Sequence, residues 1–97
     1  MAEDERGRLH AIVEGRVQGV GFRAFVIDVA DILGVTGWVR NRWDETVEVV
    51  AEGEPAVLQK LLEALQRGPR MSFVSAVKTD WLPATGEFGD FRVRQSE

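Results

Sequence analysis

The spacing of apolar residues switches between two periods along the chain, and this switching constrains the fold more than any other feature. Two stretches carry apolar residues three and four positions apart, which predicts helices that each bury one face. These stripes consist of Phe22, Phe25, Val26, Val29, Ala30 and Leu33 in the first, and of Val57, Leu58, Leu61, Leu62 and Leu65 in the second. The segments around them alternate or are rich in β-branched residues, which predicts strands.

Glycine and proline mark the ends of the predicted helices. Gly34 follows the first stripe, at a position that favours a left-handed residue. Pro55 stands in the first turn of the second helix, where its missing N–H costs little. Gly68 and Pro69 end that helix. The chain is therefore expected to form one helix that begins at Phe22 and ends before Gly34, and another between Pro55 and Gly68.

The remaining patterned segments predict strands around these helices. They are Arg8–Glu14, Val35–Arg42, Thr46–Glu52, Ser72–Asp80 and a short last strand, Asp90–Arg94, with a turn at 43–45. The order is βαββαβ with a short terminal strand, which predicts an α+β fold: a ferredoxin-like two-layer sandwich with an antiparallel sheet and both helices on one face. Residues 1–97 are expected to form a single domain, because half of the chain is too short to bury a core of its own. Residues 1–7 are polar and aperiodic and are expected to form a loose arm.

Composition excludes several classes of protein. The formal net charge of −4 argues against a general nucleic-acid binder, since such proteins usually carry an excess of Lys and Arg. With no cysteine, the chain cannot form disulfides, thiolate nucleophiles or cysteine metal sites. No apolar run approaches the roughly 20 residues needed to cross a bilayer, and the N-terminus is charged where a secretory signal would be apolar. We therefore expect a soluble, cytoplasmic protein.

A glycine-rich loop, GRVQGVGFR, lies between the first strand and the first helix. The first N–H groups of a helix lack intrahelical partners, and the helix dipole places partial positive charge there. Glycines in such a loop let successive N–H groups converge on one anion, and the guanidinium of Arg23 matches two phosphate oxygens at once. The predicted phosphate-binding residues are Gly15, Arg16, Val17, Gln18, Gly19, Val20, Gly21 and Arg23. An ordinary strand-to-helix turn with a solvated Arg23 would show the same glycine spacing, and Gln18 would then only shape the turn.

A second candidate lies in the segment GWVRN. In a strand, Gly37, Val39 and Asn41 share one face. Asn41 is the polar member of that face, and its amide has both donors and an acceptor without a charge, which suits holding a water molecule. The alternative is an asparagine that only starts the hairpin turn.

The two motifs together resemble the acylphosphatase family. VEGRVQGVGFRAFV followed by GWVRN carries the resemblance, and VEVVAEGE, LLEALQRGP and a final FRVR extend it from about Leu9 to Arg94. It implies a ferredoxin-like hydrolase that splits acyl phosphates into a carboxylate and inorganic phosphate, without a metal or organic cofactor. The resemblance places the family's phosphate-binding arginine at Arg23, its water-orienting asparagine at Asn41 and its phosphate cradle on the backbone from Gly15 to Gly21. The chain departs from the family pattern in the turn Trp43–Thr46, which lacks a glycine.

Other functions remain as alternatives. The same fold could serve as a non-catalytic small-anion-binding or regulatory module, or as an RNA-binding sheet, which needs exposed aromatics on central strands. His10 is expected to be structural, and no His/Asp/Glu cluster has the spacing of a metal site. The three tryptophans, Trp38, Trp43 and Trp81, are expected to pack in the core or at a sheet edge. We expect a free-standing, monomeric enzyme that acts on a small acyl phosphate, with no nucleic-acid or membrane partner.

Overall fold

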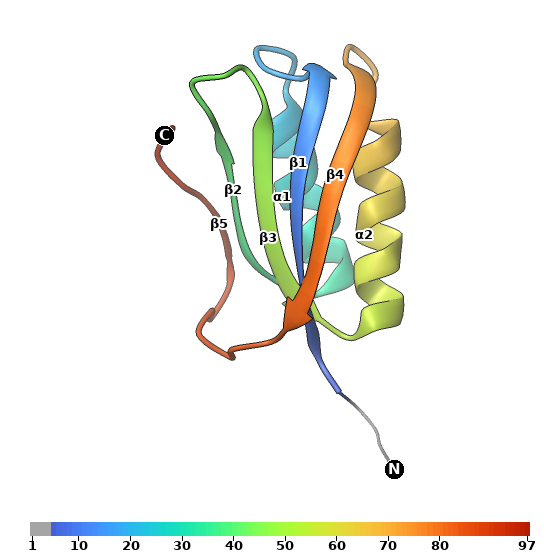
Figure 1. The fold of residues 1–97 in the computed structure, drawn as a ribbon, viewed down its shortest axis with the longest axis vertical. Coiled ribbons are helices and arrows are strands. Elements are labelled where there is room, and N and C mark those ends of the chain that lie inside the picture. The colour runs from blue at the N-terminus through green and yellow to red at the C-terminus, as the bar shows by residue number, and fades with distance from the viewer. Residues whose placement is uncertain (1–4) are drawn as a thin grey trace.

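Two helices cover one face of a five-stranded sheet (Figure 1). The computed structural model describes residues 5–97. Its elements are β1 (Gly7–Arg16), α1 (Phe22–Leu33), β2 (Thr36–Asn41), β3 (Val47–Gly53), α2 (Pro55–Arg67), β4 (Phe73–Pro83) and β5 (Phe91–Val93). The predicted order of elements is confirmed. Within residues 5–97, no helix combines the length and apolar character needed to cross a membrane.

The strands are ordered β4-β1-β3-β2-β5. The first four pair antiparallel, as expected for a ferredoxin-like α+β fold. The short β5 instead runs parallel to β2, with Gly37 opposite Phe91 and Val39 opposite Val93. The sheet is therefore mixed, and the prediction of a purely antiparallel sheet is wrong for its last strand. The physical reason is the connection: the chain crosses from the far edge strand β4 along one end of the sheet before β5 begins (Figure 1).

The helix ends follow the predicted signals. Gly34 has a φ of 73°, and its N–H donates to the carbonyl of Ala30, which closes α1. Pro55 is the first residue of α2, and the N–H of Gly68 donates to the carbonyl of Ala64. The hairpin turn without glycine places Glu45 at a φ of 74°, a conformation that glycine adopts more readily.

Two strands are longer than predicted. Gly7 pairs with both Gly53 and Pro83, so β1 begins one residue earlier and β4 continues three residues beyond Asp80. At its other end β1 continues two residues beyond Glu14, so Gly15 and Arg16, which were predicted to lie in the loop, pair with β4 instead. The predicted loose arm is thus wrong for Gly7, which belongs to the sheet. Residues 1–4 of that arm lie outside the described residues.

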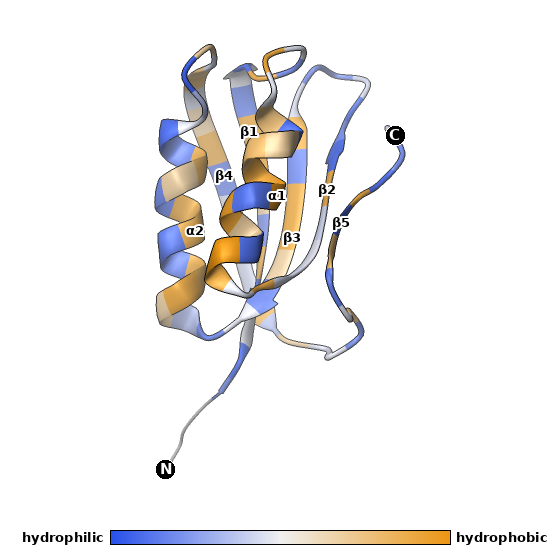
Figure 2. Ribbon diagram, turned by 180° about the vertical axis from the view of Figure 1, so that it is seen from behind, coloured by the Kyte–Doolittle hydropathy of each residue, from blue (hydrophilic) through white to orange (hydrophobic). Residues whose placement is uncertain are grey.

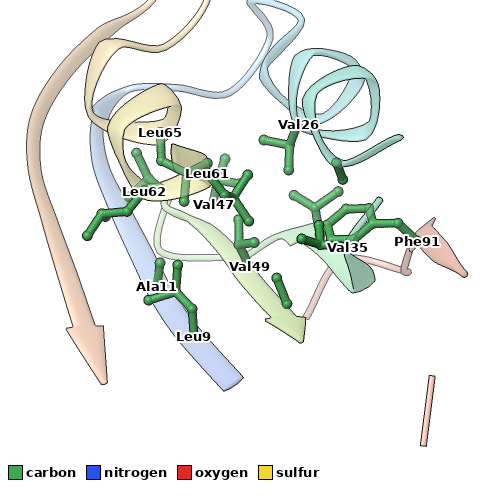
Figure 3. Close-up of a cluster of buried hydrophobic side chains, with 14 of the residues drawn as sticks. Leu9, Ala11, Val26, Val35, Val47, Val49, Leu61, Leu62, Leu65 and Phe91 are labelled. Atoms are coloured by element: carbon green, nitrogen blue, oxygen red, sulfur yellow. The ribbon is translucent and has the colours of Figure 1, made fainter. Parts of the chain in front are cut away.

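The core lies between the helices and the sheet. The polar side of α2 faces outward, whereas α1 is hydrophobic over much of its outer surface as well (Figure 2), and its Ile32 is 83% exposed. Figure 3 shows the packing of this layer, in which side chains from both helices meet those of the strands. Its fully buried members include Leu9, Val26, Val49, Leu61 and Leu65. This packing places α1 against β2 and β5 and thereby sets where the N-terminus of α1 lies.

A glycine at the start of the glycine-rich segment allows β1 and β4 to approach each other closely. Gly15 has a φ of 127°, and the pairing of the two strands shifts register between Glu14 and Gly15. A Cβ atom at Gly15 would lie 2.1 Å from the carbonyl oxygen of Phe73. Only glycine fits this bulge without displacing the backbone.

A buried carboxylate ties the β4–β5 connection to the sheet. Glu52 is 3% exposed and accepts hydrogen bonds from the side chain of Arg8 (2.8 Å) and from the backbone N–H groups of Thr85 and Gly86 (both 2.9 Å). Burial alone would raise the pKa of Glu52, but these hydrogen bonds outweigh it and lower the pKa to about 2. The carboxylate therefore stabilises the fold in its ionised form.

We expect Glu52→Gln to make the free energy of unfolding depend less on pH in the acidic range. Because the folded pKa lies below the ordinary value of 4.5, Glu52 contributes stability above pH 4.5 that is lost as the pH falls towards 2. The full pKa shift corresponds to a contribution of about 3 kcal/mol to the free energy of unfolding. Urea unfolding at pH values between 2 and 7 measures it, with the exposed Glu63→Gln on α2 as the control. Equal pH slopes for the wild type and Glu52→Gln would contradict the role given to Glu52.

Candidate active site

The glycine-rich loop and the end of β2 lie at the same end of the molecule. Figure 1 shows the β1–α1 loop beside the turn that joins β2 to β3. The side chain of Gln18 links them: its amide nitrogen donates to the carbonyls of Arg42 and Thr46, both at 2.8 Å. This link sets the position of the loop relative to Asn41, the last residue of β2.

The N-terminus of α1 opens onto this loop. Gly21 is the N-cap residue, with a φ of 80°, and no side chain of residues 5–97 caps the helix there. The first turn also contains no acidic residue. The positive end of the helix and its first N–H groups are therefore available to an anion that enters the loop.

Arg23 and Asn41 line one open pocket of about 410 Å³ together with this helix end. Arg23 lies in the first turn of α1, is exposed and forms no ion pair with a carboxylate among residues 5–97. A guanidinium without a carboxylate partner keeps its whole fork of donors for a ligand. Helix N–H groups and guanidinium together give the pocket a positive field in a protein with a net charge of −4.

Asn41 presents an unsatisfied acceptor to the pocket. Its side-chain oxygen Oδ1 is buried and has no hydrogen-bond partner within residues 5–97. A buried acceptor is normally hydrogen-bonded, so this oxygen is free to accept a hydrogen bond from a molecule that enters the pocket. A water molecule that donates to this oxygen would lie in the same pocket as a phosphate held by Arg23.

The backbone of Asn41 is held from both sides. On one side it pairs with Val47 of β3. On the other, the N–H of Glu97 donates to the carbonyl of Asn41 (3.1 Å), and the N–H of Trp43 donates to the carbonyl of Glu97 (3.0 Å). The side chain of Glu97 also pairs with Arg40 at 2.6 Å. These contacts restrict the peptide that carries the Asn41 side chain.

The predicted loop residues divide between two hollows. Val17, Gly19 and Gly21 line the pocket that contains Arg23 and Asn41. Gly15, Arg16 and Gln18 line a neighbouring hollow with Val17 and Glu45, and the side chain of Val20 packs against the core. The Gln18 amide donates its hydrogens to two backbone carbonyls, which supports the alternative that this side chain shapes the turn.

The sequence did not identify three other pocket residues, Phe22, Ala24 and Val93. Phe22 was assigned to the core, and it is 2% exposed. Val93 comes from β5, whose position beside β2 cannot be read from local periodicity. The alternation of Phe91, Arg92 and Val93 was the available signal, because it places Val93 on the same face as the buried Phe91.

The open face of the sheet is built from charged pairs. Glu48 is 6% exposed and contacts His10 (2.7 Å) and Arg40 (2.8 Å). Burial would raise the pKa of Glu48, but its hydrogen bonds to these two side chains lower it. His10 is therefore a structural residue, as expected from the sequence. The central strands β1 and β3 contain no Phe, Tyr or Trp on which an RNA-binding sheet could stack bases, and the imidazole of His10 is bound to Glu48.

The tryptophans do not belong to the buried core. Trp38 is partly buried on β2, where the guanidinium groups of Arg40 and Arg94 each lie 4.7 Å from its ring centroid. Trp43 is 80% exposed in the hairpin turn, and Trp81 is 47% exposed on the edge strand β4. The prediction of core packing is wrong, and placement at a sheet edge holds for Trp81. The physical reason is that the helices do not cover these three positions.

Within the described part of the chain, no three His, Asp or Glu side chains gather closely enough to hold a metal ion.

Comparison with known proteins places this chain in a family. A model of the acylphosphatase family matches residues 9–93. An acylphosphatase of Marinobacter nauticus is 52% identical over 85 residues, which are 88% of this chain and 92% of that protein. An acylphosphatase of Pelotomaculum thermopropionicum is 48% identical over 88 residues, 91% of this chain and 96% of that protein. The crystal structure of acylphosphatase from Bacillus subtilis superimposes with a TM-score of 0.88 at 39% identity and covers 91% of this chain and 98% of its own. The chain belongs to the acylphosphatase family.

Proposed function

We propose that this protein hydrolyses acyl phosphates to a carboxylate and inorganic phosphate by direct attack of water. The observation that carries the proposal is the meeting of three groups in one pocket: the uncapped N-terminus of α1, the guanidinium of Arg23 and the unsatisfied amide oxygen of Asn41. Membership of the acylphosphatase family supports the same activity.

In the proposed mechanism the phosphate is held by the loop and by Arg23. The N–H groups at Gly19, Gly21 and the first turn of α1 point to the phosphoryl oxygens, and Arg23 forms paired hydrogen bonds to two of them. Charge that develops on these oxygens in the transition state is thereby stabilised by donors that are already oriented. The cradle has the right chemistry for a dianion and needs no covalent intermediate.

Asn41 is assigned to the attacking water. Its Oδ1 accepts a hydrogen bond from the water, whose oxygen then attacks phosphorus in line with the departing acyl oxygen. The new P–O bond forms as the old P–O bond breaks, and the electron pair leaves with the carboxylate. An amide is a poor base, so the proton of the water passes to a phosphate oxygen of the substrate. A carboxylate is a good leaving group, so no general acid is required.

The alternative function is that of a non-catalytic module that binds a small anion in the same pocket. An assay of turnover distinguishes the enzyme from the binding module. Purified protein is expected to hydrolyse benzoyl phosphate, and Arg23→Ala is expected to lose this activity. The exposed Arg6 precedes β1 at the opposite end of the molecule, and Arg6→Ala is expected to retain the activity. Phosphate binding without turnover by the wild type would favour the non-catalytic module.

We further propose that the enzyme is a cytoplasmic monomer without a nucleic-acid partner. The groups assigned to phosphate and to water all come from one chain, so a second copy is not required to complete the pocket. The acidic composition and the ion pairs on the open sheet face give a polyanion little to bind.

We expect hydrolysis to survive exhaustive chelation and to be inhibited competitively by inorganic phosphate. Arg23 and the loop N–H groups neutralise the phosphoryl charge that a metal ion would otherwise neutralise. Product phosphate matches the same cradle and therefore competes with substrate. The assay is turnover of benzoyl phosphate after treatment with EDTA, and then with increasing phosphate. Activity that disappears on chelation and returns with one divalent metal would contradict this mechanism.

A further inference from the structure

The pocket has an apolar side that the proposed mechanism does not use. Arg23, Asn41 and the loop glycines contribute polar groups to its lining, whereas Ala24 and Val93 contribute methyl groups. Ala24 is exposed in the first turn of α1, next to Arg23. Val93 comes from β5, the strand beside the one that carries Asn41.

Val93 is placed like a core residue but remains uncovered. Phe91 and Val93 share the face of β5 that is turned to the helices, and Phe91 is only 8% exposed. Val93 is 49% exposed, lies on the edge strand β5 and lines the pocket. A half-exposed apolar side chain in the lining of the pocket offers contact area to a substrate that enters it.

The charge and the volume of the pocket limit which substrates it can bind. Of the pocket-lining residues that the structure describes, Arg23 is the only charged one. A second anionic group on the substrate would therefore find no cation of its own in the pocket. The volume of about 410 Å³ falls within the range of about 300–1,000 Å³ typical of sites for organic ligands. It leaves room for an acyl group beside the phosphate.

We propose that Val93, with Ala24, binds the acyl group and makes the enzyme prefer acyl phosphates whose acyl group is apolar and uncharged. This inference rests on the proposed function. The phosphate sits at the polar side under Arg23, and the acyl group extends along the Val93 methyl groups. Contact with the Val93 methyl groups favours substrates whose acyl group carries a phenyl ring or an alkyl chain. Substrates whose acyl group carries only a methyl group or a second phosphate gain less from this contact. Val93 is thus a specificity-determining residue and takes no part in the bond changes.

The test is the ratio of kcat/KM for benzoyl phosphate to kcat/KM for acetyl phosphate. Val93→Ala removes apolar contact, and Val93→Thr keeps the shape but replaces one methyl group by a hydroxyl. Each is expected to lower the ratio by about three- to tenfold relative to wild type, the size expected for losing one or two buried carbon groups at a half-open wall. Comparing each variant with wild type cancels the different intrinsic reactivities of the two substrates.

Leu82→Ala is the matched control, because Leu82 is 47% exposed and lies on β4 away from the pocket. It is expected to leave the ratio unchanged. Val93→Lys adds a cation at the rim and is expected to raise kcat/KM for 1,3-bisphosphoglycerate relative to benzoyl phosphate. A variant that is merely less stable would lower activity on all substrates together and leave these ratios unchanged.

Turnover of both substrates with an unchanged ratio in Val93→Ala and Val93→Thr would overturn the role of Val93, while the proposed function would stand. No turnover of either substrate by wild type would refute the proposed function and this inference with it.

Discussion

Replacing Arg23 by lysine is expected to leave the enzyme nearly inactive, although the charge is kept. An ammonium group is a compact point charge and cannot engage two phosphoryl oxygens in a fixed fork. Arg23 stands in the first turn of α1 and has no carboxylate partner among residues 5–97, so its whole fork is available to the substrate. Arginines that stabilise a transferring phosphoryl group are worth about 10³-fold or more in kcat.

Because Arg23 is assigned to both binding and charge stabilisation, its loss is expected to raise KM and lower kcat together. Steady-state kinetics with benzoyl phosphate measure both, after circular dichroism has confirmed the fold. Arg67→Lys on the surface of α2 serves as the control and is expected to be fully active. Kinetics close to wild type in a folded Arg23→Lys protein would remove Arg23 from the mechanism.

Asn41→Ala is expected to lower kcat strongly while phosphate affinity stays largely intact. The attacking water is not part of the bound anion, so ground-state binding by the loop and Arg23 survives. Removing one oriented hydrogen-bonding group typically costs about 10²–10³ in rate. Asn41→Asp is not expected to rescue activity, because a carboxylate beside the phosphoryl group repels the substrate's negative charge.

Calorimetry with inorganic phosphate and turnover of benzoyl phosphate separate the two effects. Thr36→Ala, at the other end of β2, is the matched control and is expected to change neither. If Asn41→Ala abolished phosphate binding and spared kcat, Asn41 would belong to the anion cradle. The attacking water would then need another partner.

Much of the fold follows from local sequence signals. The two helices begin and end where Phe22, Gly34, Pro55 and Gly68 predict, because capping and proline placement are local properties. The ends of the strands depend on partners far away in the chain. The last three residues of β4 become strand because Gly7 and its neighbours pair with them, and nothing within that segment indicates this.

The parallel pairing of β5 could not be predicted from the sequence, for a related reason. A strand of three residues carries too little periodicity to identify its neighbour or its direction. Its position has consequences for the site, because it brings Val93 to the pocket and leads the chain to Glu97, which holds the backbone of Asn41.

For the site itself, the sequence identified the two side chains that the structure brings together, Arg23 and Asn41. The sequence singles out these two residues because each carries a polar side chain on an element whose pattern of apolar residues is explained by packing in the core. The structure shows that side chains of the predicted loop have different roles. The side chain of Gln18 donates hydrogen bonds to the β2–β3 hairpin, and that of Val20 packs against the core. Such assignments need the path of the loop in space, which glycine spacing alone does not fix.

The most direct measurement is hydrolysis of benzoyl phosphate by the purified protein in water enriched with oxygen-18. If water attacks phosphorus in a pocket formed by Arg23 and Asn41, turnover far above the buffer rate is expected, with the label in the inorganic phosphate and none in the benzoate. No turnover, or label in the benzoate, would contradict the account, since the second result would place the attack at the carbonyl carbon.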